Sequence, residues 1–184
     1  MFLLASQSPR RSEILRQAGF VFVAKPANVD ETVLPGEDPV AYVKRVSREK
    51  ALAIEAGAKD IVLGADTVVV IDGQILGKPA DAADAARMLA MLASREHQVM
   101  TGICLRRGTE LLQDCAVTRV RFTPLTSGQI AGYVASGEPM DKAGAYAIQG
   151  LASEFIERVD GSYTNVVGLP IELVRRSLHK LGGL

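Results

Sequence analysis

The side chain with the clearest chemical potential in this sequence is Asp66, because it interrupts a strand-like apolar run. Residues 61–63 are apolar, Gly64 and Ala65 follow, and a β-branched run over residues 67–71 comes directly after the carboxylate. An ionised carboxylate among buried apolar side chains is costly unless a cation, a metal ion or hydrogen bonds compensate it. The competing interpretation is a capping or turn aspartate at a strand end, and Asp66 by itself favours neither.

Lys50 is a second charged residue that the sequence places among apolar side chains. The sequence predicts a helix over residues 38–56, and Lys50 lies one turn after Val46 and one turn before Ile54 on its apolar stripe. A lysine on a buried stripe requires an anionic partner. The other lysines and arginines of this helix have the ordinary interpretation of solvated surface groups.

Arg10 and Arg11 stand where a phosphate site is expected. A short strand over residues 2–5 leads through a polar loop into a helix over residues 10–18, with Ser8 as its N-cap. A helix N-terminus presents unpaired N–H groups and the positive end of the helix dipole, and adjacent arginines add bidentate phosphate contacts. A capped and solvated helix start is the alternative for such a motif.

Three further polar groups lie in predicted loops. Asp30 and Glu31 are adjacent carboxylates, and Lys78 follows a hairpin whose turn is Asp72-Gly73. Gln149 ends a segment rich in glycine and alanine, where the backbone can approach a ligand closely and the amide can read a base edge. Solvated surface and tight packing between elements are the competing interpretations.

The elements that must position these groups follow from periodicity and turn signals. His97 begins one of the long strands without a second ligand at metal spacing, so a structural role is favoured for it. Besides those above, we expect strands over residues 20–24, 61–71, 74–76, 98–106, 111–122 and 155–159, and helices over 82–93, 128–135 and 170–181.

Composition limits the class of protein. The chain has 184 residues, 48% of them hydrophobic and 23% charged, with a net charge of zero, which suits a single domain with one or two lobes. Nothing global predicts binding to nucleic acid or to a membrane surface. Cys104 and Cys115 have no metal or redox spacing, and the sequence contains neither a signal peptide nor a membrane span. We therefore expect a cytoplasmic protein.

Taken in order, the motifs resemble those of the Maf family of nucleoside triphosphate pyrophosphatases. Each is weak alone, but together they cover nearly the whole chain. They are ASQSPRR at 5–11, Asp30-Glu31, REKA at 48–51, GADTV at 64–68, GKP at 77–79, the segment 143–150, GSY at 161–163 and GLP at 168–170.

The resemblance implies an α/β fold in one domain over residues 1–184. Its long curved mixed sheet would have flanking helices and two lobes around a cleft, similar to inosine triphosphate pyrophosphatases. The implied reaction is metal-dependent hydrolysis between the α and β phosphates, using Mg²⁺ or Mn²⁺. The implied catalytic residues are Asp66 as proton acceptor, Lys78 and Glu31; the substrate contacts are Ser6, Arg10, Arg11, Lys50, Thr67 and Gln149; and the metal ligands are Glu31 and Asp66.

The resemblance at Gln149 indicates which nucleotide base the substrate carries. The segment resembles the branch of the family that acts on dTTP and UTP, with modified pyrimidine triphosphates as further candidates, whereas a glutamate replaces this glutamine in the branch acting on 7-methyl-GTP. The resemblance is compatible with a homodimer and implies a house-cleaning role. Two alternatives stay open: a nucleotide-binding regulator of septum formation and cell division with incidental turnover, and a phosphohydrolase that releases orthophosphate.

Overall fold

The computed structural model describes residues 1–182, and the chain divides into two compact units. The first unit comprises Met1–Thr67, Thr101–Ala116 and the described residues from Gly168 onward, and the second comprises Val68–Met100 and Val117–Val167. The expectation of a single domain over residues 1–184 stays a prediction, and its last two residues lie outside the described chain.

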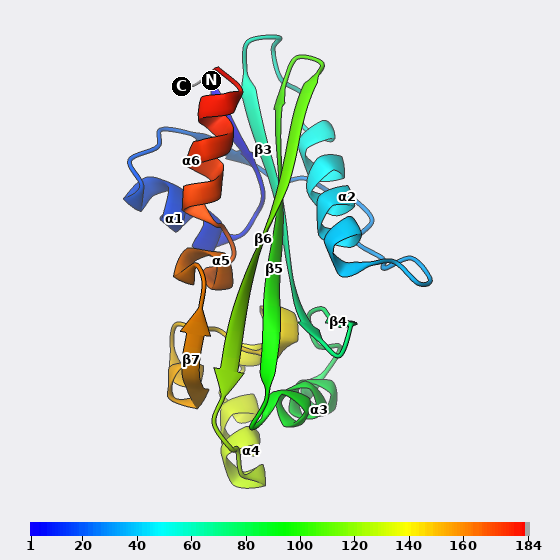
Figure 1. The fold of residues 1–184 in the computed structure, drawn as a ribbon, viewed down its shortest axis with the longest axis vertical. Helices are drawn as coiled ribbons and strands as arrows, with labels where there is room; N and C mark the ends of the chain where they lie inside the picture. The colour runs from blue at the N-terminus through cyan, green and yellow to red at the C-terminus, as the bar shows by residue number, and fades with distance from the viewer. Residues whose placement is uncertain (183–184) are drawn as a thin grey trace. The chain divides into compact units, whose positions relative to one another are not determined.

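The strands form a mixed sheet in the order β2-β1-β3-β5-β6-β7, with β4 paired to β3 (Figure 1). β1 runs parallel to β2 and β3, while the β3–β4 and β6–β7 pairs are antiparallel. A mixed α/β sheet with flanking helices was expected and is confirmed. The strands are β1 (Phe2–Ala5), β2 (Val23–Lys25), β3 (Ile61–Ile71), β4 (Gln74–Leu76), β5 (Glu96–Arg107), β6 (Glu110–Phe122) and β7 (Ile156–Asp160).

The helices are distributed along the chain among these strands. No helix among residues 1–182 is both long and apolar enough to cross a membrane. The α-helices are α1 (Pro9–Gln17), α2 (Pro39–Leu52), α3 (Ala82–Leu92), α4 (Ser127–Ala135), α5 (Tyr163–Val167) and α6 (Ile171–Lys180). Three 3-10 helices, η1 (Glu138–Asp141), η2 (Ala143–Ala145) and η3 (Leu151–Phe155), were not expected from the sequence.

Most predicted boundaries differ from the structure by no more than two residues, and two elements differ by more. The second strand is Val23–Lys25 rather than residues 20–24. The second helix ends at Leu52, four residues before the predicted end. Arg106 of β5 explains this early end, because its guanidinium donates to the carbonyls of Ala51 and Ile54. A basic side chain that satisfies the last free carbonyls stabilises a helix end at that point.

In the first unit, two glycines bring α2 against the sheet. A Cβ added at Gly64 of β3 would lie 2.1 Å from the Ser47 carbonyl oxygen, and one added at Gly102 of β5 would lie 2.3 Å from that of Val43. Any side chain at either position would therefore push the helix away. This approach buries Val43 and Val46, and it fixes the direction of the other side chains on the same face of α2.

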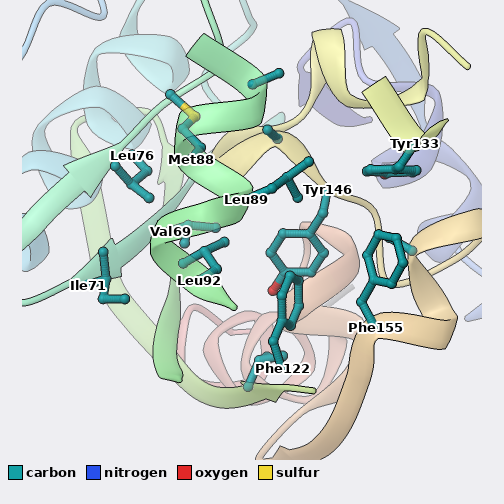
Figure 2. Close-up of a cluster of buried hydrophobic side chains, with 14 of the residues drawn as sticks. Val69, Ile71, Leu76, Met88, Leu89, Leu92, Phe122, Tyr133, Tyr146 and Phe155 are labelled. Carbon is teal, nitrogen blue, oxygen red and sulfur yellow. The ribbon is translucent and has the colours of Figure 1, made fainter. Parts of the chain in front are cut away.

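The second unit has its own apolar core, drawn in Figure 2. Leu89 and Leu92 of α3 are fully buried within it, and Phe122 and Tyr146 meet edge to face with ring centroids 4.8 Å apart. Tyr133 and Phe155 form a second edge-to-face pair at 5.3 Å. Edge-to-face contact is the favoured geometry for such rings, so the aromatic side chains fix how the η segments pack in this unit.

The predicted β3–β4 hairpin is confirmed. Asp72 and Gly73 have φ angles of 51° and 75°, and Val69 pairs with Leu76. Positive φ at both central residues is the requirement of a type I′ turn, which Asp-Gly satisfies. β4 ends at Leu76, so Lys78 lies two residues past its end.

Candidate active site

Lys50 is the centre of the charged cluster in the first unit. Its ammonium lies 2.7 Å from Asp66 Oδ1 and 2.7 Å from Glu31 Oε1. The side chains of Lys50 and Asp66 are 9% and 8% exposed, whereas that of Glu31 is 48% exposed. The predicted anionic partner of Lys50 is therefore present. Asp66 lies inside β3 and is not a turn or capping aspartate.

The helix register and the close approach at Gly64 together direct Lys50 to Asp66. Lys50 is in the last turn of α2, one turn beyond the fully buried Val46. Gly64, two residues before Asp66, lies against the backbone of Ser47 and Ala51. The ammonium therefore reaches the carboxylate directly, and the contact is a charge-assisted hydrogen bond between two nearly buried side chains.

The loop that carries Glu31 is held by two other side chains of α2. The hydroxyl of Tyr42 donates to the Glu31 carbonyl at 2.8 Å, and Arg45 donates to the Thr32 carbonyl at 3.0 Å. Arg45 also binds Glu37 at 2.6 Å and thereby lowers the pKa of Glu37 to about 2. Burial, followed by the negative charges of Asp66 and Glu31, raises the pKa of Tyr42, so this hydroxyl stays protonated.

Arg11 organises a second group of predicted substrate contacts. Its Nε donates to the Gly168 carbonyl at 2.8 Å, and its terminal nitrogens donate to Ser6 Oγ at 3.2 Å and Thr67 Oγ1 at 3.1 Å. The Thr67 hydroxyl also lies 2.9 Å from that of Thr101. Arg11 is thus buried and largely committed to the protein itself. It holds Ser6 and Thr67 in place, a role that the sequence did not predict.

The α1 N-terminus has the expected form. Ser8 caps the helix, with the Arg11 amide 3.5 Å from its hydroxyl, and Pro9 is the first helical residue. Burial lowers the pKa of Arg11, while the charges of Asp66 and Glu31 oppose that shift. Arg10 is half-buried at the same helix start. The first unit therefore contains the predicted residues Ser6, Arg10, Arg11, Glu31, Lys50, Asp66 and Thr67.

The second unit contains the two remaining predicted residues, Lys78 and Gln149, and both are exposed. Their segments are joined by a hydrogen bond from the Gly144 amide to the Gly77 carbonyl at 2.9 Å. Gln149 follows the buried Ile148, so its neighbour anchors the chain while the amide side chain stays open to a ligand. The roles assigned to all nine residues stay predictions.

Glu31 and Asp66 fit a magnesium or manganese ion by their chemistry. They are carboxylates, the hard oxygen donors that these ions prefer, and both reach the same ammonium group. Residues 1–182 contain no cluster of three or more histidine, cysteine or acidic residues arranged for a metal ion. Mg²⁺ typically uses one or two carboxylates together with substrate phosphates, so two donors suffice for that kind of site.

Comparison with known proteins identifies the family. The family model described as Maf-like protein matches residues 1–181. The chain belongs to the Maf-like family. The expectation drawn from the sequence motifs is thereby confirmed.

Relatives of this Maf-like chain are similar over nearly their whole length. A protein named dTTP/UTP pyrophosphatase from Anaeromyxobacter sp. (strain Fw109-5) is 54% identical, over 97% of this chain and 90% of the relative. One of the same name from Koribacter versatilis (strain Ellin345) is 49% identical, over 99% and 95%. A solved dITP/XTP pyrophosphatase from Mycobacterium abscessus is 14% identical, covers 98% of this chain and 96% of its own, and has a TM-score of 0.45.

Sequence reasoning missed the residues of this Maf-like chain that hold the predicted site residues. Tyr42 and Thr101 were not singled out, and Arg45 was interpreted as a solvated surface group. Tyr42 precedes Val46 and Lys50 at four-residue spacing on α2, and that spacing was the available signal for its position beside Lys50. Nothing in the local sequence indicates that Thr101 meets Thr67, because that contact joins two strands.

Proposed function

We propose that this Maf-like protein is a metal-dependent nucleoside triphosphate pyrophosphatase that hydrolyses dTTP and UTP, and modified pyrimidine triphosphates, to the monophosphate and pyrophosphate. Family membership supports this proposal, as do relatives at about half identity that carry the name dTTP/UTP pyrophosphatase. In this reaction a water molecule hydrolyses the phosphoanhydride bond between the α and β phosphates. Its oxygen and its protons are taken up by the two products.

The observation that carries the proposal is the contact of Lys50 with both Asp66 and Glu31, each at 2.7 Å. A nearly buried lysine between two carboxylates does not stabilise the fold more than apolar side chains of the same shape would. The cost of removing the charges from water offsets their attraction. The presence of this charged cluster is better explained by a catalytic role. Asp66 is the group best placed to accept the proton of the attacking water, and the ammonium orients that carboxylate.

The reaction also requires positive charge to neutralise the triphosphate, which basic side chains and a metal ion supply. A triphosphate carries roughly four negative charges, and phosphoryl transfer depends mostly on positioning and charge neutralisation. Arg10 at the α1 N-terminus and Lys78 after β4 are assigned to phosphate oxygens. Arg11 contributes mainly by holding Ser6 and Thr67. A divalent cation held by Glu31 and Asp66 would add charge neutralisation and orient the triphosphate when bound.

Selection of the base is assigned to Gln149. A neutral amide offers one acceptor and two donors, and so complements the acceptor-donor-acceptor edge of uracil or thymine. Its exposure leaves these groups open to a ligand. This assignment makes pyrimidine triphosphates the preferred substrates.

Product analysis tests the proposal directly. The protein is incubated with dTTP, UTP, dGTP and ATP in Mg²⁺ or Mn²⁺, and pyrophosphate and orthophosphate are quantified separately. We expect pyrophosphate from dTTP and UTP. Orthophosphate as the product would replace the proposal with a different phosphohydrolase. Tight nucleotide binding without any product would instead favour the regulator of septum formation and cell division.

The proposal extends to the cellular setting implied by the resemblance: a cytoplasmic house-cleaning enzyme that forms a homodimer. Light scattering of the purified protein tests the dimer, and a monomer at micromolar concentration would remove it.

A further inference from the structure

The segment that carries Gln149 is held on both sides by one pair of side chains. The Ala147 amide donates to the Tyr133 hydroxyl at 3.3 Å, and this hydroxyl donates to Glu138 Oε1 at 2.9 Å. The other carboxylate oxygen, Glu138 Oε2, accepts from the Leu151 amide at 3.2 Å. A single hydrogen-bonded path therefore joins the amides two residues before and two residues after Gln149.

Gly150 shows how closely this path approaches the backbone. Its φ is +91°, and an added Cβ would lie 2.8 Å from Glu138 Oε2. Glu138 is itself held at the end of α4, where its amide donates to the Ser136 hydroxyl at 3.2 Å. The carboxylate thus fills the space beside Gly150 and leaves no room for a side chain at position 150.

A second contact anchors the same segment from the sheet. Tyr146 is 5% exposed, and its hydroxyl lies 2.8 Å from His97 Nε2 of β5. Figure 2 shows the Tyr146 ring beside Phe122 in the second unit's core. Burial raises the pKa of Tyr133 and of Tyr146, so both hydroxyls stay protonated and keep their hydrogen bonds.

We propose that Tyr133 and Glu138 are positioning residues that set the direction of Gln149 and thereby the preference for pyrimidine triphosphates. The inference rests on the proposed function of Gln149. Neither side chain has to touch the substrate, because both act through the backbone amides that flank Gln149. A side chain directed by two fixed amides loses little freedom on binding, and a preorganised contact discriminates better than a mobile one.

The test compares Glu138→Gln with a matched control, Glu157→Gln. Tyr133 and Leu151 bind different oxygens of Glu138. Glu138→Gln replaces one of these oxygens with an NH2 donor, so it cannot accept from Tyr133 at one atom and from Leu151 at the other. Glu157 lies on β7 in the same unit, is half-exposed and pairs with Arg121 at the surface. Tyr133→Phe removes the same hydrogen-bonded path from its other end.

The readout is the ratio of kcat/KM for dTTP to that for dGTP. We expect Glu138→Gln and Tyr133→Phe each to lower this ratio by roughly tenfold, the size of one lost pocket contact. The loss should lie mainly in KM for dTTP. The double variant should lose no more than either single variant, because both break the same path. Glu157→Gln should keep the wild-type ratio.

Hydrogen exchange at the Ala147 and Leu151 amides separates positioning from general loss of structure. Faster exchange with a lowered ratio supports the proposal. Faster exchange with an unchanged ratio overturns it, since the two residues would then be structural only. Unchanged exchange and an unchanged ratio overturn it as well. Equal turnover of dTTP and dGTP by the wild-type protein would instead refute the proposed function, before any variant is compared.

Discussion

The two units hold their predicted site residues by different means. In the first, Asp66 lies inside a long strand and Lys50 in the last turn of a long helix, and they are fixed by charge and by close packing at Gly64. In the second, Gln149 lies between short 3-10 helices and depends on neutral hydrogen bonds and aromatic packing. Regular elements give precise placement to the chemistry, whereas irregular backbone lets a base-reading side chain be exposed.

This difference predicts that variants around Asp66 and Lys50 change turnover with every nucleotide, whereas variants around Gln149 change the choice of nucleotide. Asp66→Asn is the strongest test. It keeps the shape of the side chain but removes the proton acceptor, so we expect turnover to fall by at least ~100-fold, as for a lost general base. Nucleotide binding, measured by calorimetry, should be largely kept. Near-native turnover would show that Asp66 is not the base.

Lys50→Met is expected to have the next largest effect, on folding stability. It leaves Asp66 nearly buried without its cation, and removing one partner of such a pair costs about 3 kcal/mol. Urea unfolding measures the loss. Asp66→Asn in the same chain should restore much of it, because the carboxylate left without its partner is then removed. Additive losses in the double variant would show that the pair does not interact as its 2.7 Å distance indicates.

The charge pair was the part of the site most accessible from the sequence. Lys50 shares four-residue spacing with Val46 and Ile54, which predicted an anionic partner for it, and Asp66 interrupts an apolar run, which predicted a compensating cation, metal or hydrogen bonds. The sequence did not predict that the two residues are partners. The partnership of Glu31 with Lys50 was not predicted, because the resemblance implied Glu31 as a metal ligand and Lys50 as a substrate contact. The Glu31 loop is placed by Tyr42 and by Arg45, contacts that depend on where the loop returns to α2.

The fold was predictable where local signals are strong. Asp72-Gly73 specified its hairpin, and Ser8 its helix start. The run of 3-10 helices was not predictable, since it depends on backbone angles that only the packed structure enforces. Ala145 has a φ of 59°, a conformation that alanine rarely adopts alone, and it persists because its side chain is fully buried in the second unit's core.

The second unit is expected to be the more sensitive to acid through His97. Burial lowers the pKa of His97 to about 4 from 6.5, and its Nδ1 has no hydrogen-bond partner among the described residues. Above pH 6.5 the imidazole is neutral in both states. As pH falls from 6.5 to 4, only the unfolded chain takes up the proton, so folding loses about 3 kcal/mol through this group.

Unfolding curves measured between pH 4 and 7 check this expectation. His97→Gln removes the titrating group, so its free energy of unfolding should depend less steeply on pH than that of the wild-type protein. His179→Gln makes the same change at an exposed histidine of α6 and should leave the slope unaltered. Equal slopes for all three proteins would mean that His97 takes up its proton over the same pH range in the folded and the unfolded chain.

The smallest expected effect gives the sharpest comparison of the two units. Tyr42→Phe and Tyr133→Phe each remove one tyrosine hydroxyl, the first from one unit and the second from the other. Tyr42→Phe deletes the hydroxyl that donates to the Glu31 carbonyl, a hydrogen bond worth about 1 kcal/mol, or roughly fivefold in turnover. That loss should be equal for dTTP and dGTP, since Glu31 is assigned to the phosphate end. Tyr133→Phe should change their ratio. If Tyr42→Phe changed the ratio as well, the division between a catalytic group around Asp66 and a selective segment around Gln149 would be wrong.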